Sequence, residues 1–219
     1  MKMRILIGLS TAFMLSALYM VFIFVPSDAE TGIIQRIFYF HVPLAWIAFL
    51  AFFVVFGCSI MYLWKRDRKW DILASSSAEV GLVFTTLFLL TGSIWARPVW
   101  GVWWTWDSRL TSSLILWLIY LAYFIIRSYI SEEGRRARFA AIVGIIGFID
   151  VPIIAMAITL WRTQHPGPVI FEGGLVTEMI WTLIVSIAAF TALYVLIFSY
   201  RVLIKQDEDD LNRLKALRR

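Results

Sequence analysis

The sequence predicts an all-α integral membrane protein. Hydrophobic residues make up 61% of the 219 residues, and the mean hydropathy is +0.80, whereas soluble domains contain about 45–50% apolar residues. The apolar residues form runs of roughly 20, the length at which an α-helix crosses a bilayer, without the alternating segments of a membrane β-barrel. No separate soluble domain fits between the runs. We therefore expect one membrane domain over residues 1–205 and a charged cytoplasmic tail over residues 206–219.

We expect six membrane-spanning helices joined by short connections. The predicted spans are residues 5–25, 43–64, 74–95, 112–130, 139–161 and 179–203. The first run leads into the sequence SDAE without a small-residue cleavage site, so we expect it to stay as a span that ends at Pro26. The tail mixes both charges at helical spacing, which predicts either a solvated helical extension or a weak docking site for a cytoplasmic partner.

The distribution of Lys and Arg predicts the orientation of the chain. All but four of the 20 basic residues lie at one side of the predicted spans, and the four exceptions are Arg36, Arg97, Arg109 and Arg162. Basic connections face the cytoplasm, so both termini are expected there and three connections face outward: residues 26–42, 96–111 and 162–178. The inner basic segments are typical of anchors that meet the anionic lipid bilayer, and the net charge of +5 does not indicate a nucleic-acid partner.

Only two histidines occur, and the predicted orientation places both at the outer membrane face. His41 precedes Pro43 by two residues, and His165 directly precedes Pro166. Two imidazoles can occupy both axial positions of a haem iron, whereas a zinc site needs three or four protein ligands. Interfacial histidines also cap helices or bond to loop carbonyls. Since Cys58 is the single cysteine and no CxxCH segment occurs, any haem must bind non-covalently.

A tryptophan-rich segment lies between the third and fourth predicted spans. Five of the chain's eleven tryptophans fall in this region: Trp95, Trp100, Trp103, Trp104 and Trp106. A helix over residues 99–110, beginning after Pro98, would place Val99, Trp103, Trp106 and Leu110 on one face. Such an amphipathic segment would lie at the outer surface and offer a platform for a flat aromatic ligand. The alternative is the aromatic belt of a membrane interface.

The outer arginines are candidates for pairing with the propionate groups of a haem, because a guanidinium binds a carboxylate through two hydrogen bonds. Of these, Arg109 is the preferred candidate, because it lies two residues beyond Asp107.

Residues 100–111, WGVWWTWDSRLT, resemble the WWD signature of haem-handling membrane proteins. With six predicted spans and flanking outer histidines, the chain resembles the cytochrome c maturation protein C (CcmC) family over essentially its whole length. The resemblance implies a multi-pass, non-enzymatic haem chaperone in the bacterial inner membrane that binds haem b non-covalently as its transferred ligand. His41 and His165 would be axial ligands. The expected haem-contacting residues are Trp95, Trp100, Trp103, Trp104, Trp106, Asp107 and Arg109.

The same resemblance implies a set of partners. These are a periplasmic haem-carrier protein, the ATPase and membrane subunits of an ABC transporter, and a small single-span accessory protein.

The sequence leaves two other classes of function open. A transmembrane haem oxidoreductase predicts histidines deep within the spans, and a transporter or structural subunit predicts a polar, discontinuous helix near the midplane. The predicted spans are almost uniformly apolar except at Glu79 and Asp150. Intramembrane acids are functional candidates. For these two we favour structural roles, because Glu79 is near Ser75 and Asp150 can bond to backbone released by Pro152.

Overall fold

The structure is a computed structural model that describes residues 2–161, 163–165 and 174–217. These residues form six long helices: α1 (Lys2–Tyr19), α2 (Phe38–Lys65), α3 (Arg68–Trp100), α4 (Ser108–Tyr129), α5 (Glu133–Leu160) and α6 (Thr177–Leu217). A π-helical turn, Met20–Phe24, extends α1, and a 3-10 turn, Ile33–Ile37, leads into α2. Six helical segments are long and apolar enough to cross a membrane. The predicted all-α fold with six spans is confirmed.

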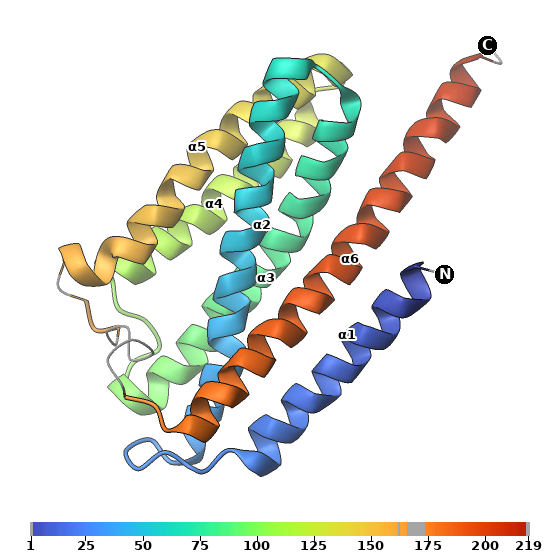
Figure 1. Cartoon of the computed structure of the whole chain (residues 1–219). Helices are drawn as coiled ribbons and strands as arrows, with labels where there is room; N and C mark the ends of the chain where they lie inside the picture. Colours follow the sequence, from blue (N-terminus) through green and yellow to red (C-terminus); the bar gives the residue numbers. More distant parts are fainter. Residues whose placement is uncertain (1, 162, 166–173, 218–219) are drawn as a thin grey trace.

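The helices run up and down, so the connections gather at two opposite ends (Figure 1). The short α2–α3 and α4–α5 connections lie at one end, toward which the N-terminus of α1 and the C-terminus of α6 also point. We call this the arginine end. The α1–α2, α3–α4 and α5–α6 connections lie at the opposite end, which we call the histidine end.

Helix α2 is at the centre of the packing. It packs against α3, α5 and α6, while α4 packs on α5 and α1 packs on α6. On one side of α2, the ring of Phe52 stacks on Tyr120 of α4 with centroids 3.5 Å apart. On the other side, Ile47 belongs to a cluster with Phe84 and Phe190 of α3 and α6. Large apolar side chains on several faces of α2 therefore hold the bundle together through dispersion contacts and exclusion of solvent.

Small residues on α3 allow α2 to approach closely. The Ser77 hydroxyl donates to the Ala51 carbonyl oxygen at 2.7 Å. At Gly81, an added Cβ would lie 2.7 Å from the Phe52 ring and 3.0 Å from Cβ of Ala51. Small side chains at helix contacts in membranes increase the area of packing between backbones. The relative position of α2 and α3 is thus set by side chains that are absent or short.

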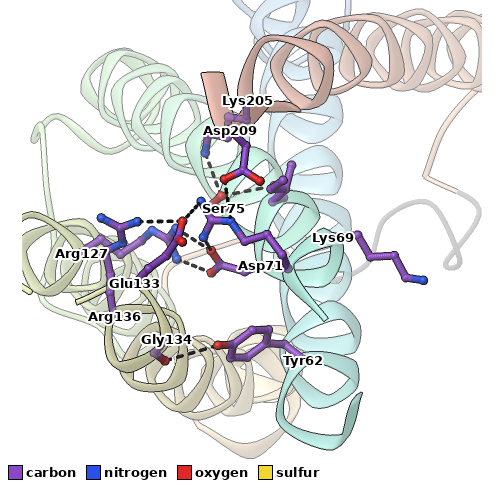
Figure 2. Close-up of polar contacts among 12 residues, drawn as sticks. Tyr62, Lys69, Asp71, Ser75, Arg127, Glu133, Gly134, Arg136, Lys205 and Asp209 are labelled. Carbon is purple, nitrogen blue, oxygen red and sulfur yellow. Dashed lines mark hydrogen bonds and ion pairs between the residues drawn. The ribbon is translucent and has the colours of Figure 1, made fainter. Parts of the chain in front are cut away.

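A network of ion pairs joins four helices at the arginine end (Figure 2). The buried Asp71 carboxylate of α3 accepts from Arg68 at 2.8 Å and from Arg127 of α4 at 2.5 and 3.0 Å. Arg68 also pairs with Glu133 of α5 at 2.5 Å and with Asp209 of α6 at 3.2 Å. Because each buried charge has an opposite partner, the network avoids the cost of an isolated charge in a low-dielectric environment.

Glu79 takes part in a second set of ion pairs between α3 and α6. It pairs with Arg201 at 2.6 Å and with Lys205 at 2.7 Å, and Lys205 also donates to Ser75 at 2.9 Å. These contacts support the structural role expected for Glu79. Helix α6 continues beyond Lys205 without a break to Leu217.

Asp150 differs from Glu79, because its Oδ2 atom is buried and has no hydrogen-bond partner among the described residues. The expected bond to backbone near Pro152 is therefore not seen for this oxygen.

Replacing Asp71 with Asn should destabilise the fold by about 3 kcal/mol, because Arg127 would lose its partner while remaining buried. Thermal unfolding of the purified protein in detergent would measure the change. Asp207→Asn is a matched control, since Asp207 is an exposed acid on α6. Equal unfolding temperatures for the two variants would show that the ion pairs of Asp71 contribute little to the stability of the fold.

Candidate functional site

A hollow lies at the histidine end; its cavity volume is about 60 Å³, and it measures about 600 Å³ when the adjoining open space is included. Side chains from α2, α3, α4 and the α5–α6 connection line it. The lining residues are His41, Phe88, Leu89, Gly92, Ser93, Trp95, Ala96, Val99, Trp100, Trp104, Arg109, Leu110, Ser113 and His165. Both histidines and Arg109, the one cation among these lining residues, therefore share one largely apolar surface.

The two imidazoles face each other across a short gap. Their ring centroids are 6.5 Å apart and their planes are inclined by 31°. Bonds of about 2.0–2.1 Å from one metal ion to a nitrogen of each ring would put the ring centres roughly 6–7 Å apart. Both rings line one hollow, and their spacing suits a single metal ion between them.

His41 is held firmly within the α2–α3 contact. Its side chain is buried, and its ring lies 4.8 Å from that of Phe88 and 5.8 Å from that of Trp95, centroid to centroid. The Nδ1 atom is 3.1 Å from the Thr91 hydroxyl. At Gly92, an added Cβ would lie 2.9 Å from Cε1 of His41. Glycine at this position leaves the room that the ring occupies.

The tryptophan-rich segment does not form the helix expected over residues 99–110. Helix α3 continues through Pro98 to Trp100 and ends at Gly101, whose φ of +77° is a left-handed conformation that glycine adopts without strain. Residues 101–107 are non-helical, and α4 begins after Asp107. The prediction that Val99, Trp103, Trp106 and Leu110 share one face of a helix is therefore wrong.

This geometry divides the five tryptophans into two groups. Trp95, Trp100 and Trp104 line the hollow, whereas Trp103 is 59% exposed and Trp106 is 76% exposed. The indole N–H groups of Trp95 and Trp104 are buried without a partner among the described residues. An unsatisfied buried donor costs about 1–3 kcal/mol. These two groups are therefore suited to a polar atom of a ligand.

The described outer arginines also have different surroundings. Arg109 lines the hollow, and it belongs to none of the ion pairs within the described part of the chain. Arg97 instead donates to the Gly101 carbonyl oxygen and closes the end of α3. Arg36 lies in the 3-10 turn and does not line the hollow. Arg162 lies outside the described residues. Among the arginines that the structure describes, Arg109 is the one placed to meet an anionic ligand.

Asp107 was expected to contact the ligand, but it is not among the residues that line the hollow. Its Oδ1 atom accepts from the backbone N–H groups of Arg109 at 3.0 Å and Leu110 at 3.3 Å, which caps α4. The same atom accepts from the Thr163 hydroxyl at 2.7 Å, and Oδ2 accepts from Thr105 at 2.6 Å. The Thr163 hydroxyl in turn accepts from the backbone N–H of His165 at 3.1 Å. Asp107 thus connects the start of α4 to the His165 connection.

Burial disfavours the charged form of Asp107, but the hydrogen bonds from Thr105, Thr163 and the α4 backbone outweigh it. The pKa of Asp107 is therefore lower than that of an ordinary aspartate. The carboxylate stays charged, and so able to accept all these bonds, at neutral and mildly acidic pH.

Four residues near the site did not emerge from the sequence: Phe88, Thr91, Gly92 and Thr163. Phe88 and Gly92 lie on the same face of α3 as Trp95 and Val99, at the spacing of helical turns. Extending that face inward from Trp95 would have found them. The contacts of Thr91 and Thr163 join residues 50 and 56 positions apart, and no local pattern indicates them.

Comparison with known proteins gives one consistent family. A family model described as Heme exporter protein C matches residues 1–215. Heme exporter protein C of Bradyrhizobium diazoefficiens is 39% identical over 173 residues, which cover 78% of this chain and 66% of the relative. The Rhodobacter capsulatus protein of that name is 32% identical over 200 residues, covering 90% and 81%. The Escherichia coli protein of that name is 34% identical over 145 residues, covering 66% and 59%.

Replacing Asp107 with Ala should loosen both the start of α4 and the His165 connection. Loss of the helix cap costs about 0.5–2 kcal/mol. The pKa of Asp107 is lowered in the fold, so its contribution is complete above the ordinary value of 3.8 and is lost as the pH falls through the lower folded value. Hydrogen exchange at neutral pH should become faster at residues 163–165.

Asp28→Ala provides the matched control for this experiment. Asp28 caps its own turn, where its carboxylate accepts hydrogen bonds from Glu30 and Thr31. Unchanged exchange at residues 163–165 in the Asp107 variant would show that the carboxylate does not hold this connection.

Proposed function

The chain belongs to the Heme exporter protein C family, and on this basis we propose that it is a haem chaperone of cytochrome c biogenesis. It binds haem b non-covalently at the outer, periplasmic face and delivers it to a periplasmic haem-carrier protein. It is a non-enzymatic membrane subunit, because its task is to hold and release haem rather than to change it.

The observation that carries this proposal is the histidine pair. A centroid separation of 6.5 Å suits one metal ion bound on both sides by imidazole. Haem iron accepts two axial imidazoles. His41 and His165 are therefore the proposed axial ligands. They are the only histidines in the chain and lie at one end of the bundle, whereas an oxidoreductase with haems across the membrane needs further ligands.

The remaining lining residues suit the other parts of a haem. Trp95, Trp100 and Trp104 offer apolar surface to the macrocycle, at about 25 cal/mol per Å² buried. Arg109 is the proposed partner of a propionate, as a guanidinium binds a carboxylate through two hydrogen bonds. Asp107 supports the site indirectly by holding the His165 connection through Thr163.

Release to a carrier requires a site that another protein can reach. The hollow is open to solvent, and exposed Trp103 and Trp106 lie beside its lining residue Trp104. We assign Trp103 and Trp106 to contact with the carrier rather than to haem binding. The other proposed partners are the ATPase and membrane subunits of an ABC transporter and a small single-span protein.

The proposed location is the bacterial inner membrane, with both termini in the cytoplasm. The arginine end contains most of the basic residues and the histidine end contains few. Since basic connections remain on the cytoplasmic side, the hollow faces the periplasm.

Absorption spectra of the protein purified from haem-replete cells without its carrier would test the proposal. The parent should show a Soret band, which His41→Ala and His165→Ala should weaken or shift because each removes an axial ligand. Trp104→Ala should retain less haem, whereas Trp64→Ala should match the parent, as Trp64 is an exposed residue in the last turn of α2, at the arginine end. A folded parent without haem, or unaltered spectra for both histidine variants, would favour a structural subunit or transporter instead.

Gly92→Ala should impair haem binding by crowding the His41 ring. The new Cβ would lie 2.9 Å from Cε1 of His41 and displace the ring. Alanine within a helix is more stable than glycine by about 0.5–1 kcal/mol. We expect a weaker or shifted Soret band and an unfolding temperature below that of Gly57→Ala, because crowding of the buried His41 ring opposes the gain in helix stability. Gly57→Ala is the control, because its Cβ would meet nothing within 4 Å. Identical spectra for both variants would argue against tight placement of the His41 ring.

A further inference from the structure

We propose that Thr91 is a positioning residue that selects the proton-bearing nitrogen of His41. Its hydroxyl accepts a hydrogen bond from Nδ1–H, which leaves Nε2 with the lone pair needed to bind iron. The ligand role of Nε2 rests on the proposed function. The position of the proton does not, since it follows from contacts within the protein.

The hydrogen bonds of the Thr91 hydroxyl give the direction of the contact. Oγ1 lies 2.8 Å from the Leu87 carbonyl oxygen and 3.1 Å from that of Phe88. Carbonyl oxygens only accept, and a hydroxyl has one hydrogen and two lone pairs. The hydrogen of Thr91 is therefore directed at its own helix. With the hydrogen so directed, a lone pair remains for the contact with Nδ1 of His41 at 3.1 Å, and Nδ1 is then the donor.

The direction of this bond decides which imidazole nitrogen can bind a metal. A neutral imidazole has one N–H nitrogen and one nitrogen with a free lone pair. With the proton on Nδ1, the lone pair is on Nε2. Metal-binding histidines commonly donate their other ring N–H to a neighbouring acceptor, which fixes both the tautomer and the orientation of the ring. Thr91 supplies such an acceptor from α3 to a histidine on α2.

Comparison with other threonines of α3 shows what is particular to Thr91. Thr85 and Thr86 also donate to the carbonyl oxygen four residues earlier, at 2.7 and 2.8 Å. That bond is therefore an ordinary property of threonine within this helix. Among the three, Thr91 adds the contact with a histidine ring. The Gly92 backbone beside it leaves space for the same ring, so two consecutive residues determine where His41 lies.

Nuclear magnetic resonance of ¹⁵N-histidine-labelled protein without haem tests the tautomer directly. The chain has two histidines, so the His165→Ala background reports on His41 alone. We expect the proton on Nδ1 in this background and in Thr91→Ser, which keeps the hydroxyl. In Thr91→Val, the share of the Nδ1–H form should fall, although the Phe88 carbonyl remains as another acceptor near the ring. Thr85→Val is the control and should leave the tautomer unchanged.

Haem binding by the full chain supplies the second measurement. Thr91→Val should lower haem affinity by roughly 10-fold or more, as expected for loss of such a supporting contact, and should shift the Soret band. Thr91→Ser and Thr85→Val should stay close to the parent.

The outcomes separate this inference from the proposed function. A parent without haem, or a His41→Ala variant with the parent spectrum, would refute the ligand role of His41. An unchanged tautomer in Thr91→Val would overturn the inference, whether or not His41 binds haem. A proton found on Nε2 in the His165→Ala background would overturn it too. A fall in the Nδ1–H form with Thr91→Val, restored in Thr91→Ser, would support it.

Discussion

The close contact between α2 and α3 is the constraint on which the rest of the structure depends. At Ser77, Gly81 and Gly92, α3 presents little or no side chain toward α2. Large residues of α2 fill the space: Phe52 lies against Gly81, and the His41 ring lies against Gly92. The arrangement that packs the bundle therefore also places the proposed ligand. Since interiors are closely packed, a change in this contact would move His41 together with the core.

The charged side chains at the two ends of the bundle differ in how they are paired. At the arginine end, Arg68, Arg127 and Lys205 each have a carboxylate within 3.2 Å. At the histidine end, Arg109 lines the largely apolar hollow, and although the charge of Asp107 acts on it, the described residues form no salt bridge with it. A cation in weakly polar surroundings attracts an anion strongly, because little water screens it. The first arrangement stabilises the helices, and the second suits recognition of an anionic ligand.

The helices and the two proposed ligands could be predicted because their signals are local. The length of the apolar runs indicated the spans. His41 and His165 stood out because they are the only two histidines in the sequence and each lies close to a proline. The conformation of the tryptophan segment was harder to predict. The helical spacing of its residues favoured a continuous helix, whereas Gly101 ends α3 and Asp107 caps the start of α4. The contacts of Thr91 and Thr163 could not be predicted, because they depend on how separate segments pack in three dimensions.

The length of α3 has a consequence for where a ligand would be held. At about 1.5 Å per residue its 33 residues extend roughly 50 Å, whereas the hydrocarbon layer of a bilayer is about 30 Å thick. Even a tilted helix of this length reaches into the headgroup region. Its last turns contain Trp95, Ala96, Val99 and Trp100, which line the hollow. On this reasoning we place the hollow at the boundary between lipid and water. An amphiphilic molecule bound at this boundary can keep its apolar part at the level of the lipid chains while its charged groups stay hydrated.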